Sequence, residues 1–285
     1  MMSPLAHAAA PSPATRIIPA DGRRLAVVGL GTWQTFDVGT NAAARDNLGK
    51  LLSRFVELGG EVIDSSPMYG SSESVVGDLV SERKLRERLF FATKVWTSGK
   101  AAGIAQMEES LRRLKSPRIE LMQIHNLQDW KLHLPVLREW KAAERIRYLG
   151  ITHYSRGAYA EIEDILRTEP LDFLQINYSL AEQESARRLL PLAAEHGVAV
   201  IANQPFAAGA LFSRVKDRTL PAAAADHGCR SWAQLFLRWI LAHSAVTCAI
   251  PASNRIEHLE DNMAAGMGAL PGFEEQKALA RMAGF

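Results

Sequence analysis

The chain has 285 residues, of which 47% are hydrophobic and 22% are charged, and its formal net charge is +2. This composition is typical of a soluble globular protein, and a charge so close to neutral gives no case for a nucleic acid or an anionic membrane as partner. No apolar run is long enough to span a bilayer, so we expect no membrane-spanning segment.

The two cysteines and the first residues bear on the compartment. Cys229 and Cys248 lie far apart and form no CxxC pair, so the sequence suggests neither a metal site nor a disulfide framework. A reducing compartment, the cytoplasm, is therefore expected. Residues 1–15 are rich in Ala and Pro, and we expect them to be disordered. Ala6-His7-Ala8 is similar to a signal cleavage site but follows no charged and apolar regions, so a periplasmic protein with a trimmed leader is the alternative.

After residue 15 the chain begins with a hairpin and then alternates between two kinds of segment. The hairpin is predicted over 16–27, with Asp21-Gly22 as its turn. Strand-like apolar runs then alternate with amphipathic helices. We expect the strands at 28–33, 61–64, 89–94, 119–125, 147–152, 172–177, 197–202 and 246–250. We expect helices at 41–58, 72–81, 104–114, 135–143, 155–165, 182–195, 231–242 and 255–265. The helix at 182–195 should be broken near Pro191, and the helix at 255–265 should be the last one. The stretch 203–230 is expected to be irregular.

Eight such alternations imply parallel strands joined by right-handed crossovers, and they close naturally into a barrel. The predicted fold class is therefore α/β, a (β/α)8 TIM barrel with an N-terminal β-hairpin, formed by residues 16–285 as one domain. Gly29 and Gly31 invite comparison with a dinucleotide-binding turn. Because Gln34 replaces the third glycine and no acid follows at the right distance, we interpret these glycines as positions of close packing or ligand approach.

Three successive predicted strands end in titratable residues. These are Asp64, Lys94 and His125, and Tyr69 follows the first of them in Asp64-Ser65-Ser66-Pro67-Met68-Tyr69-Gly70. Catalytic groups of such barrels lie at the C-terminal strand ends, so we expect the four side chains to converge. A lone strand-end Lys or His is usually only a solvated residue at the rim, and Asp64 alone could simply cap a turn.

The four residues together suit the protonation of a carbonyl oxygen. A phenol has a pKa near 10, too high for an efficient acid at neutral pH, and we expect the Lys94 ammonium to lower it. Asp64 would hold Lys94, while His125 would donate to a substrate oxygen or polarise Tyr69. Because no side chain donates hydride, a nicotinamide cofactor is required.

At these residues the chain resembles the aldo-keto reductases, whose acid, tyrosine, lysine and histidine map onto Asp64, Tyr69, Lys94 and His125. The resemblance runs from about residue 16 to about residue 262. It implies reduction of an aldehyde or ketone with NADPH as cofactor. It also implies cofactor contacts at Gly31, Thr32, Thr152, His153, Gln175, Asn203, Pro205, Ser253, Asn254, Arg255, His258 and Asn262.

Several positions depart from the family pattern. Thr152-His153 stands where many members carry Ser-Asn, and Asn203 where many carry a stacking tyrosine. Ala252 replaces a lysine or glycine, and His258 an arginine, which leaves Arg255 as the expected contact of the 2′-phosphate. Ser253 could instead be a helix cap. Four apolar residues follow strand ends and could wall a substrate mouth: Trp33, Met68, Trp96 and Trp130.

Two other functions stay open at this stage. A regulatory protein could keep the barrel and a bound nucleotide while turning over little, as the beta subunits of potassium channels do. A cofactor-free isomerase could use His125 or Lys94 as a base, although this leaves Tyr69 unexplained. The expected partner is a small-molecule carbonyl compound, and the residues predict no oligomeric state.

Overall fold

The computed structural model describes residues 12–285. Most of the segment expected to be disordered, 1–15, lies outside the described residues. Its last residues are ordered: Pro13 forms an antiparallel bridge with Met267, and the Ala14 amide donates to the Gly266 carbonyl over 2.7 Å. Residues 13–15 are therefore ordered, contrary to the expectation for this part of the segment.

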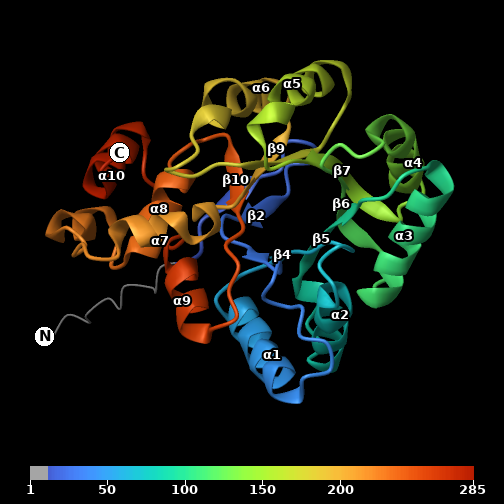
Figure 1. Ribbon diagram of the computed structural model, residues 1–285, viewed down its shortest axis with the longest axis horizontal. Coiled ribbons are helices and arrows are strands. Elements are labelled where there is room, and N and C mark those ends of the chain that lie inside the picture. The colour runs from blue at the N-terminus through green and yellow to red at the C-terminus, as the bar shows by residue number, and fades with distance from the viewer. Residues whose placement is uncertain (1–11) are drawn as a thin grey trace, which may run out of the picture.

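Eight parallel strands follow one another around a barrel in sequence order (Figure 1). Parallel bridges from Val28 to Ala249 and from Gly31 to Ala252 join the last strand to the first. The strands are β3 (Leu30–Gly31), β4 (Val62–Asp64), β5 (Phe90–Val95), β6 (Ile119–His125), β7 (Ile146–Thr152), β8 (Phe173–Asn177), β9 (Ala199–Asn203) and β10 (Val246–Ala249). The predicted (β/α)8 barrel is confirmed.

Glycines allow the barrel to close. A Cβ atom at Gly29 would lie 2.9 Å from Val62 Cβ, and one at Gly31 would lie 3.0 Å from the Ile250 carbonyl oxygen. The first distance is too short for a side chain and the second leaves almost no room for one. Gly29 thus packs closely against β4, and Gly31 against the residue after β10, as the close-packing interpretation expects.

Helices surround the strands on the outside (Figure 1). They are α1 (Ala42–Glu57), α2 (Ser72–Glu82), α3 (Lys100–Arg113), α4 (Trp130–Ala142), α5 (Tyr159–Thr168), α6 (Leu189–Glu195), α7 (Ala210–Val215), α8 (Trp232–Leu241), α9 (Ile256–Ala264) and α10 (Phe273–Ala283). Helix α9 packs against α1, which completes the ring. Among residues 12–285, no helix has the length and apolar character needed to cross a membrane.

The helices differ from the expected ones in four places. The stretch 203–230 contains α7 and is not wholly irregular, and α10 follows the helix expected to be the last. Helix α4 begins at Trp130, five residues before the expected start. The break before α6 falls at Arg188, where φ is −136°. Pro191 therefore sits in the first turn of α6, where a missing N–H costs no hydrogen bond.

Successive side chains along each strand point alternately into and out of the barrel, which produces two hydrophobic cores. Inside the barrel, the rings of Phe90, Tyr148 and Phe173 lie with centroids 5.4–6.0 Å apart. The hairpin of β1 (Thr15–Ile17) and β2 (Arg24–Ala26) closes the N-terminal end of the barrel and buries Ile18 and Leu25 fully. The antiparallel pairing of these strands confirms the predicted hairpin.

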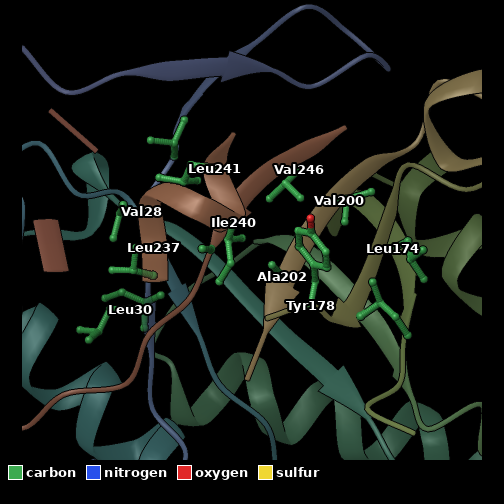
Figure 2. Packing of buried hydrophobic residues seen from close by; sticks show 14 of the residues in the cluster. Val28, Leu30, Leu174, Tyr178, Val200, Ala202, Leu237, Ile240, Leu241 and Val246 are labelled. Carbon is green, nitrogen blue, oxygen red and sulfur yellow. The ribbon is translucent and has the colours of Figure 1, made fainter. Parts of the chain in front are cut away.

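The second core lies between the strands and the helices. Figure 2 shows Leu237, Ile240 and Leu241 of α8 among outward side chains of the sheet, such as Val200 and Val246. Alternate side chains of each strand therefore point outward to the helices, and those between them point into the barrel. The inward ones form the first core, and at the C-terminal end of the barrel they are polar.

The contact between α2 and α3 generates a stability prediction. A methyl group at Gly77 of α2 would meet the carbonyl oxygen of Arg113 at 2.0 Å, and that backbone cannot yield. We expect Gly77→Ala to destabilise the protein by about 1–3 kcal/mol, the scale of overpacking, although alanine normally favours a helix over glycine by about 1 kcal/mol. Urea unfolding followed by circular dichroism measures the difference.

A matched control lies on the neighbouring helix. The atoms nearest to a methyl group at Gly49 of α1 would be those of the Arg83 guanidinium, the far end of a flexible side chain. We expect Gly49→Ala to be neutral or stabilising by up to about 1 kcal/mol. Equal unfolding midpoints for the Gly77 and Gly49 variants would contradict the packing argument.

Candidate active site

A polar layer crosses the barrel interior at the C-terminal end of the strands. Strand alternation directs one inward side chain from each of five neighbouring strands, β4 to β8, into this layer. Its members are all buried: Asp64, Lys94, Gln123, Thr152 and Gln175, with His125 two residues beyond Gln123. Asp64, Lys94 and His125 therefore lie at the strand ends where the sequence placed them.

Lys94 is fully buried, and its ammonium donates to two oxygens. Nζ donates to Asp64 Oδ2 over 2.8 Å and to the Ser65 carbonyl over 2.6 Å. Burial by itself would lower the pKa of Lys94, but the negative charges around it, that of Asp64 foremost, and the hydrogen bond to Asp64 together raise this pKa above its usual value. Lys94 is therefore a permanent buried cation at neutral pH.

Two glutamines hold the other oxygen of Asp64. Gln175 Nε2 donates to Asp64 Oδ1 over 2.8 Å, and Gln123 Nε2 lies 3.4 Å from the same atom. Gln175 Oε1 also accepts from Thr152 Oγ1 over 3.1 Å, so both polar atoms of Gln175 are engaged within the protein. Gln175 positions Asp64 here, although the sequence assigned it to the cofactor. Sequence reasoning missed Gln123, whose signal is a polar residue in the apolar run of β6, two residues before His125.

A tight turn places Tyr69 over the polar layer. The Tyr69 amide donates to the Ser66 carbonyl over 3.0 Å, and Pro67 occupies the second position of this turn, where its fixed φ is favourable. Gly70 follows with φ of +59°, and a Cβ there would lie 2.3 Å from the Asp37 carboxylate. Lys94 Nζ lies 5.2 Å from the centroid of the Tyr69 ring.

The pKa of Tyr69 differs from the sequence expectation. Burial raises the pKa of Tyr69 above its ordinary value, and the charge of Asp64 adds to this. The charge of Lys94 acts in the opposite direction, as expected, but burial prevails. Tyr69 is therefore fully protonated at neutral pH in the structure. The charge of Lys94 offsets only part of the rise in its pKa that burial causes.

His125 is a neutral imidazole at the same place. Burial and the positive charge of Lys94 lower the pKa of His125 to about 3. Its ring stands edge-on to that of Tyr69, with centroids 6.2 Å apart, and Trp96 lies at 6.4 Å. The structure thus brings together all four residues that the sequence selected, two of them charged and two neutral.

Three of the four apolar residues expected at the mouth have large exposed surfaces. Trp33, Met68 and Trp96 are 41–48% exposed and follow β3, β4 and β5. Trp130 is different, because its indole N–H donates to Glu161 of α5 over 2.8 Å and it lines a hollow with Leu134 and Glu169. Trp130, the first residue of α4, thus contacts α5, so the structure does not support it as a wall of the mouth.

Polar residues continue along the next strand ends. His153 Nδ1 accepts from the amides of Tyr154 and Ser155, both over 3.0 Å, which leaves the ring proton on Nε2. Asn203 Nδ2 donates to the His153 carbonyl over 3.1 Å. Asn203 Oδ1 is buried and has no partner among the described residues. Thr32 Oγ1 lies 3.0 Å from the Asp64 carbonyl and from Ser65 Oγ.

The segment after β10 leads into α9 beside the first strand, because Ala252 bridges Gly31. Ser253 Oγ accepts from the Arg255 amide over 3.2 Å, so Ser253 orders the start of the helix. Arg255 occupies the N-cap position, is exposed, and lies 3.6 Å from Glu257. Four other expected contacts lie on this segment or after β9: Asn254 and His258 are exposed, whereas Pro205 and Asn262 are buried.

Comparison with known proteins shows the family of this chain. The sequence pattern of the aldo/keto reductase family matches residues 27–271. A methylglyoxal reductase (YeaE) of Escherichia coli is 31% identical over 84% of this chain and 85% of its own length. A 9,11-endoperoxide prostaglandin H2 reductase of Trypanosoma cruzi is 27% identical over 84% of this chain and 81% of its own length.

Solved structures share the fold at similar levels of identity. An aldo-keto reductase of Klebsiella pneumoniae in complex with NADPH superposes with a TM-score of 0.80 at 28% identity, covering 96% of this chain and 95% of its own. Another, from the same organism with NADP and acetate, gives 0.76 at 29% identity, covering 92% and 93%. With the family pattern extending over most of the sequence and the four residues assembled at one end of the barrel, this chain belongs to the aldo/keto reductase family of NAD(P)H-dependent oxidoreductases.

Proposed function

We propose that this protein reduces the carbonyl group of a small aldehyde or ketone to an alcohol, with NADPH as reductant and Tyr69 as proton donor. The observation that carries the proposal is the fully buried Lys94, held by Asp64 and 5.2 Å from the Tyr69 ring. A buried cation has no role in packing, since it must be compensated at a cost in desolvation. Beside a phenol it favours the loss of a proton.

The residues divide the work of one proton transfer. Tyr69 keeps its proton until a carbonyl oxygen begins to gain negative charge, because burial raises its pKa. As the proton leaves, the phenolate forms close to Lys94, whose charge stabilises it without any rearrangement. Neutral His125 donates an N–H to the same oxygen. When bound, the nicotinamide of NADPH supplies the hydride.

The residues beside the site fit a nicotinamide. A carboxamide has one acceptor and one donor group, and the protein offers a complementary pair: His153 Nε2–H and Asn203 Oδ1, which has no partner within residues 12–285. These two would hold the carboxamide in place of the Ser-Asn pair and stacking tyrosine of many members. The relatives solved with NADP and NADPH support this cofactor.

The substrate mouth supports a small carbonyl compound with an apolar part, since Trp33, Met68 and Trp96 border it. The similarity to a methylglyoxal reductase suggests methylglyoxal as the first compound to test. NADPH and NADH consumption with a panel of aldehydes and ketones tests the function. A nucleotide-binding regulatory protein would bind NADPH and consume almost none. We propose the cytoplasm as location, where NADPH is available.

The first prediction tests the acid. Tyr69→Phe removes only the phenolic oxygen, so turnover should fall on the order of 10²- to 10⁴-fold, the usual contribution of a general acid. NADPH affinity, measured by fluorescence titration, should stay within a few-fold of wild type. Wild-type turnover of methylglyoxal by this variant would remove Tyr69 from the mechanism.

The second prediction concerns the charges around Tyr69. Lys94 lowers and Asp64 raises the pKa of Tyr69, so their removal should move the alkaline limb of activity in opposite directions. In Lys94→Met the pKa of Tyr69 rises and the limb moves to higher pH, with activity almost as low as in Tyr69→Phe. In Asp64→Asn the limb moves to lower pH and the loss is milder, because Lys94 remains but is held less well.

The pH profile of kcat decides this prediction, and thermal melting serves as its control. Removing one partner of a buried pair leaves the other uncompensated and destabilises by about 3–5 kcal/mol. The double variant Asp64→Asn, Lys94→Met should therefore melt closer to wild type than Lys94→Met alone. Limbs that stay in place in both single variants would refute the coupling.

The third prediction concerns the choice between NADPH and NADH. Arg255 stands at the N-cap of α9, beside free backbone N–H groups that favour a phosphate. We expect wild type to prefer NADPH, and Arg255→Ala to weaken NADPH binding by about 1–3 kcal/mol, the scale of a charged hydrogen bond. NADH binding should hardly change, and Arg281→Ala on α10 is the surface control. Equal weakening of both cofactors would exclude Arg255 as the reader of the 2′-phosphate.

A further inference from the structure

The hydroxyl of Ser66 is buried next to the catalytic histidine. Ser66 is fully buried, and its Oγ lies 3.4 Å from His125 Nδ1. Its other neighbour is the Met68 amide, which donates to Oγ, also over 3.4 Å. Among the described residues these are the hydrogen-bond partners of Ser66 Oγ. The sequence marked Ser66 only as a small hydroxyl residue of the Asp64–Gly70 stretch.

The two neighbours fix the direction of the hydrogen bond. An amide N–H can only donate, so it takes a lone pair of Oγ and leaves the hydroxyl hydrogen to find an acceptor. His125 Nδ1 is the acceptor within reach. In the opposite arrangement, with a proton on Nδ1, Oγ would face two donors and its own hydrogen would be buried without a partner. Such an unsatisfied donor costs about 1–3 kcal/mol.

We propose that Ser66 is a positioning residue that fixes the tautomer of His125, by donating to Nδ1 and so keeping the ring proton on Nε2. Its catalytic consequence rests on the proposed function, whereas the tautomer itself does not. Nε2 forms no hydrogen bond to the described residues, so its proton is free for a ligand at the site. The opposite tautomer would present a lone pair there and repel a carbonyl oxygen.

The surroundings of His125 make this control necessary. A doubly protonated imidazole would be a donor at both nitrogens and would need no help from Ser66. Burial and the charge of Lys94 oppose that state, and the pKa of His125 is lowered accordingly. A neutral ring has only one proton, and its location decides whether His125 is a donor or an acceptor toward a ligand. Ser66 makes that choice before any ligand arrives.

Nitrogen-15 NMR of the cofactor-free protein tests the tautomer directly. In histidine-labelled wild type we expect Nε2 of His125 to resonate as a protonated nitrogen and Nδ1 as an unprotonated one, from pH 5 to pH 8. The His125→Gln variant assigns the signal, because it is the one that disappears. A wild-type spectrum with the proton on Nδ1, or with both nitrogens protonated, would overturn the proposal without any variant.

Ser66→Ala tests the cause. Both nitrogen signals of His125 should move toward the average of two exchanging tautomers. Ser65→Ala is the matched control, since it removes the adjacent hydroxyl, which contacts Thr32 and not His125, and it should leave the His125 signals unchanged. Ser66→Cys retains a weak donor of similar shape and should give intermediate shifts. Identical His125 signals in wild type and Ser66→Ala would refute the role of Ser66.

Kinetics then separate this proposal from the proposed function. Loss of one hydrogen bond should lower kcat/KM for the carbonyl about three- to tenfold in Ser66→Ala, with NADPH affinity unchanged. If wild type reduces no carbonyl compound, the proposed function fails while the tautomer result stands. If activity falls in Ser66→Ala but the His125 signals do not move, Ser66 acts by some other route and the present proposal is wrong.

Discussion

The site depends on one constraint, the burial of an ammonium group inside the barrel. Lys94 has no exposed surface, and moving its charge out of water would cost several kcal/mol if nothing compensated it. The protein compensates it with Asp64 and with the Ser65 carbonyl, and it then has to satisfy the second oxygen of Asp64 as well. Gln175 and Gln123 do this. The polar layer is thus the set of residues that one buried charge requires.

The barrel is what makes such a layer possible. Aromatic rings and the hairpin fill the interior below it, so water does not reach Lys94 from the N-terminal end. In the register of the parallel strands, Lys94 lies opposite Gln123, whereas Asp64 lies opposite Ala92, two residues before Lys94 on β5. Because inward side chains of neighbouring strands meet at this end of the barrel, Lys94 on β5 reaches Asp64 on β4, and Asp64 in turn is reached by Gln123 on β6 and Gln175 on β8.

The sequence was sufficient for the barrel and for placing the three strand-end residues and Tyr69 together, because both follow from repeated local patterns. Strand β6 was expected at its observed bounds, since a run of apolar residues ends there in His125. Helices α7 and α10 were not predicted, because contacts with other segments stabilise them. Helix α10 packs on α8, and its last carbonyls accept from Arg218 of the loop after α7. Such contacts between distant segments leave no periodic trace in the sequence.

Some residues of the site were not predicted from the sequence, for a similar reason. Gln123 and Ser66 act through partners 59 residues away in the chain, Asp64 and His125, and a lone amide or hydroxyl gives no local signal of that role. Gln175 was selected as a cofactor contact, and its contact with Asp64 was not foreseen, because this contact depends on the size of the barrel and not on its own strand. Trp130 was misplaced because α4 begins five residues earlier than expected, which carries the indole to the outer surface of the barrel.

We expected Lys94 to lower the pKa of Tyr69, but burial raises this pKa by more than Lys94 lowers it. Burial acts on Tyr69, Lys94 and His125 alike, always against the charged form. Lys94 remains charged because Asp64 provides a counter-charge, whereas His125 is buried beside the repelling charge of Lys94 with no counter-charge and stays neutral. Tyr69 lies between these extremes, with a cation too far away to offset burial fully. A proton donor benefits from this balance, since it must hold its proton until the acceptor becomes negative and must then leave an anion that a nearby charge stabilises.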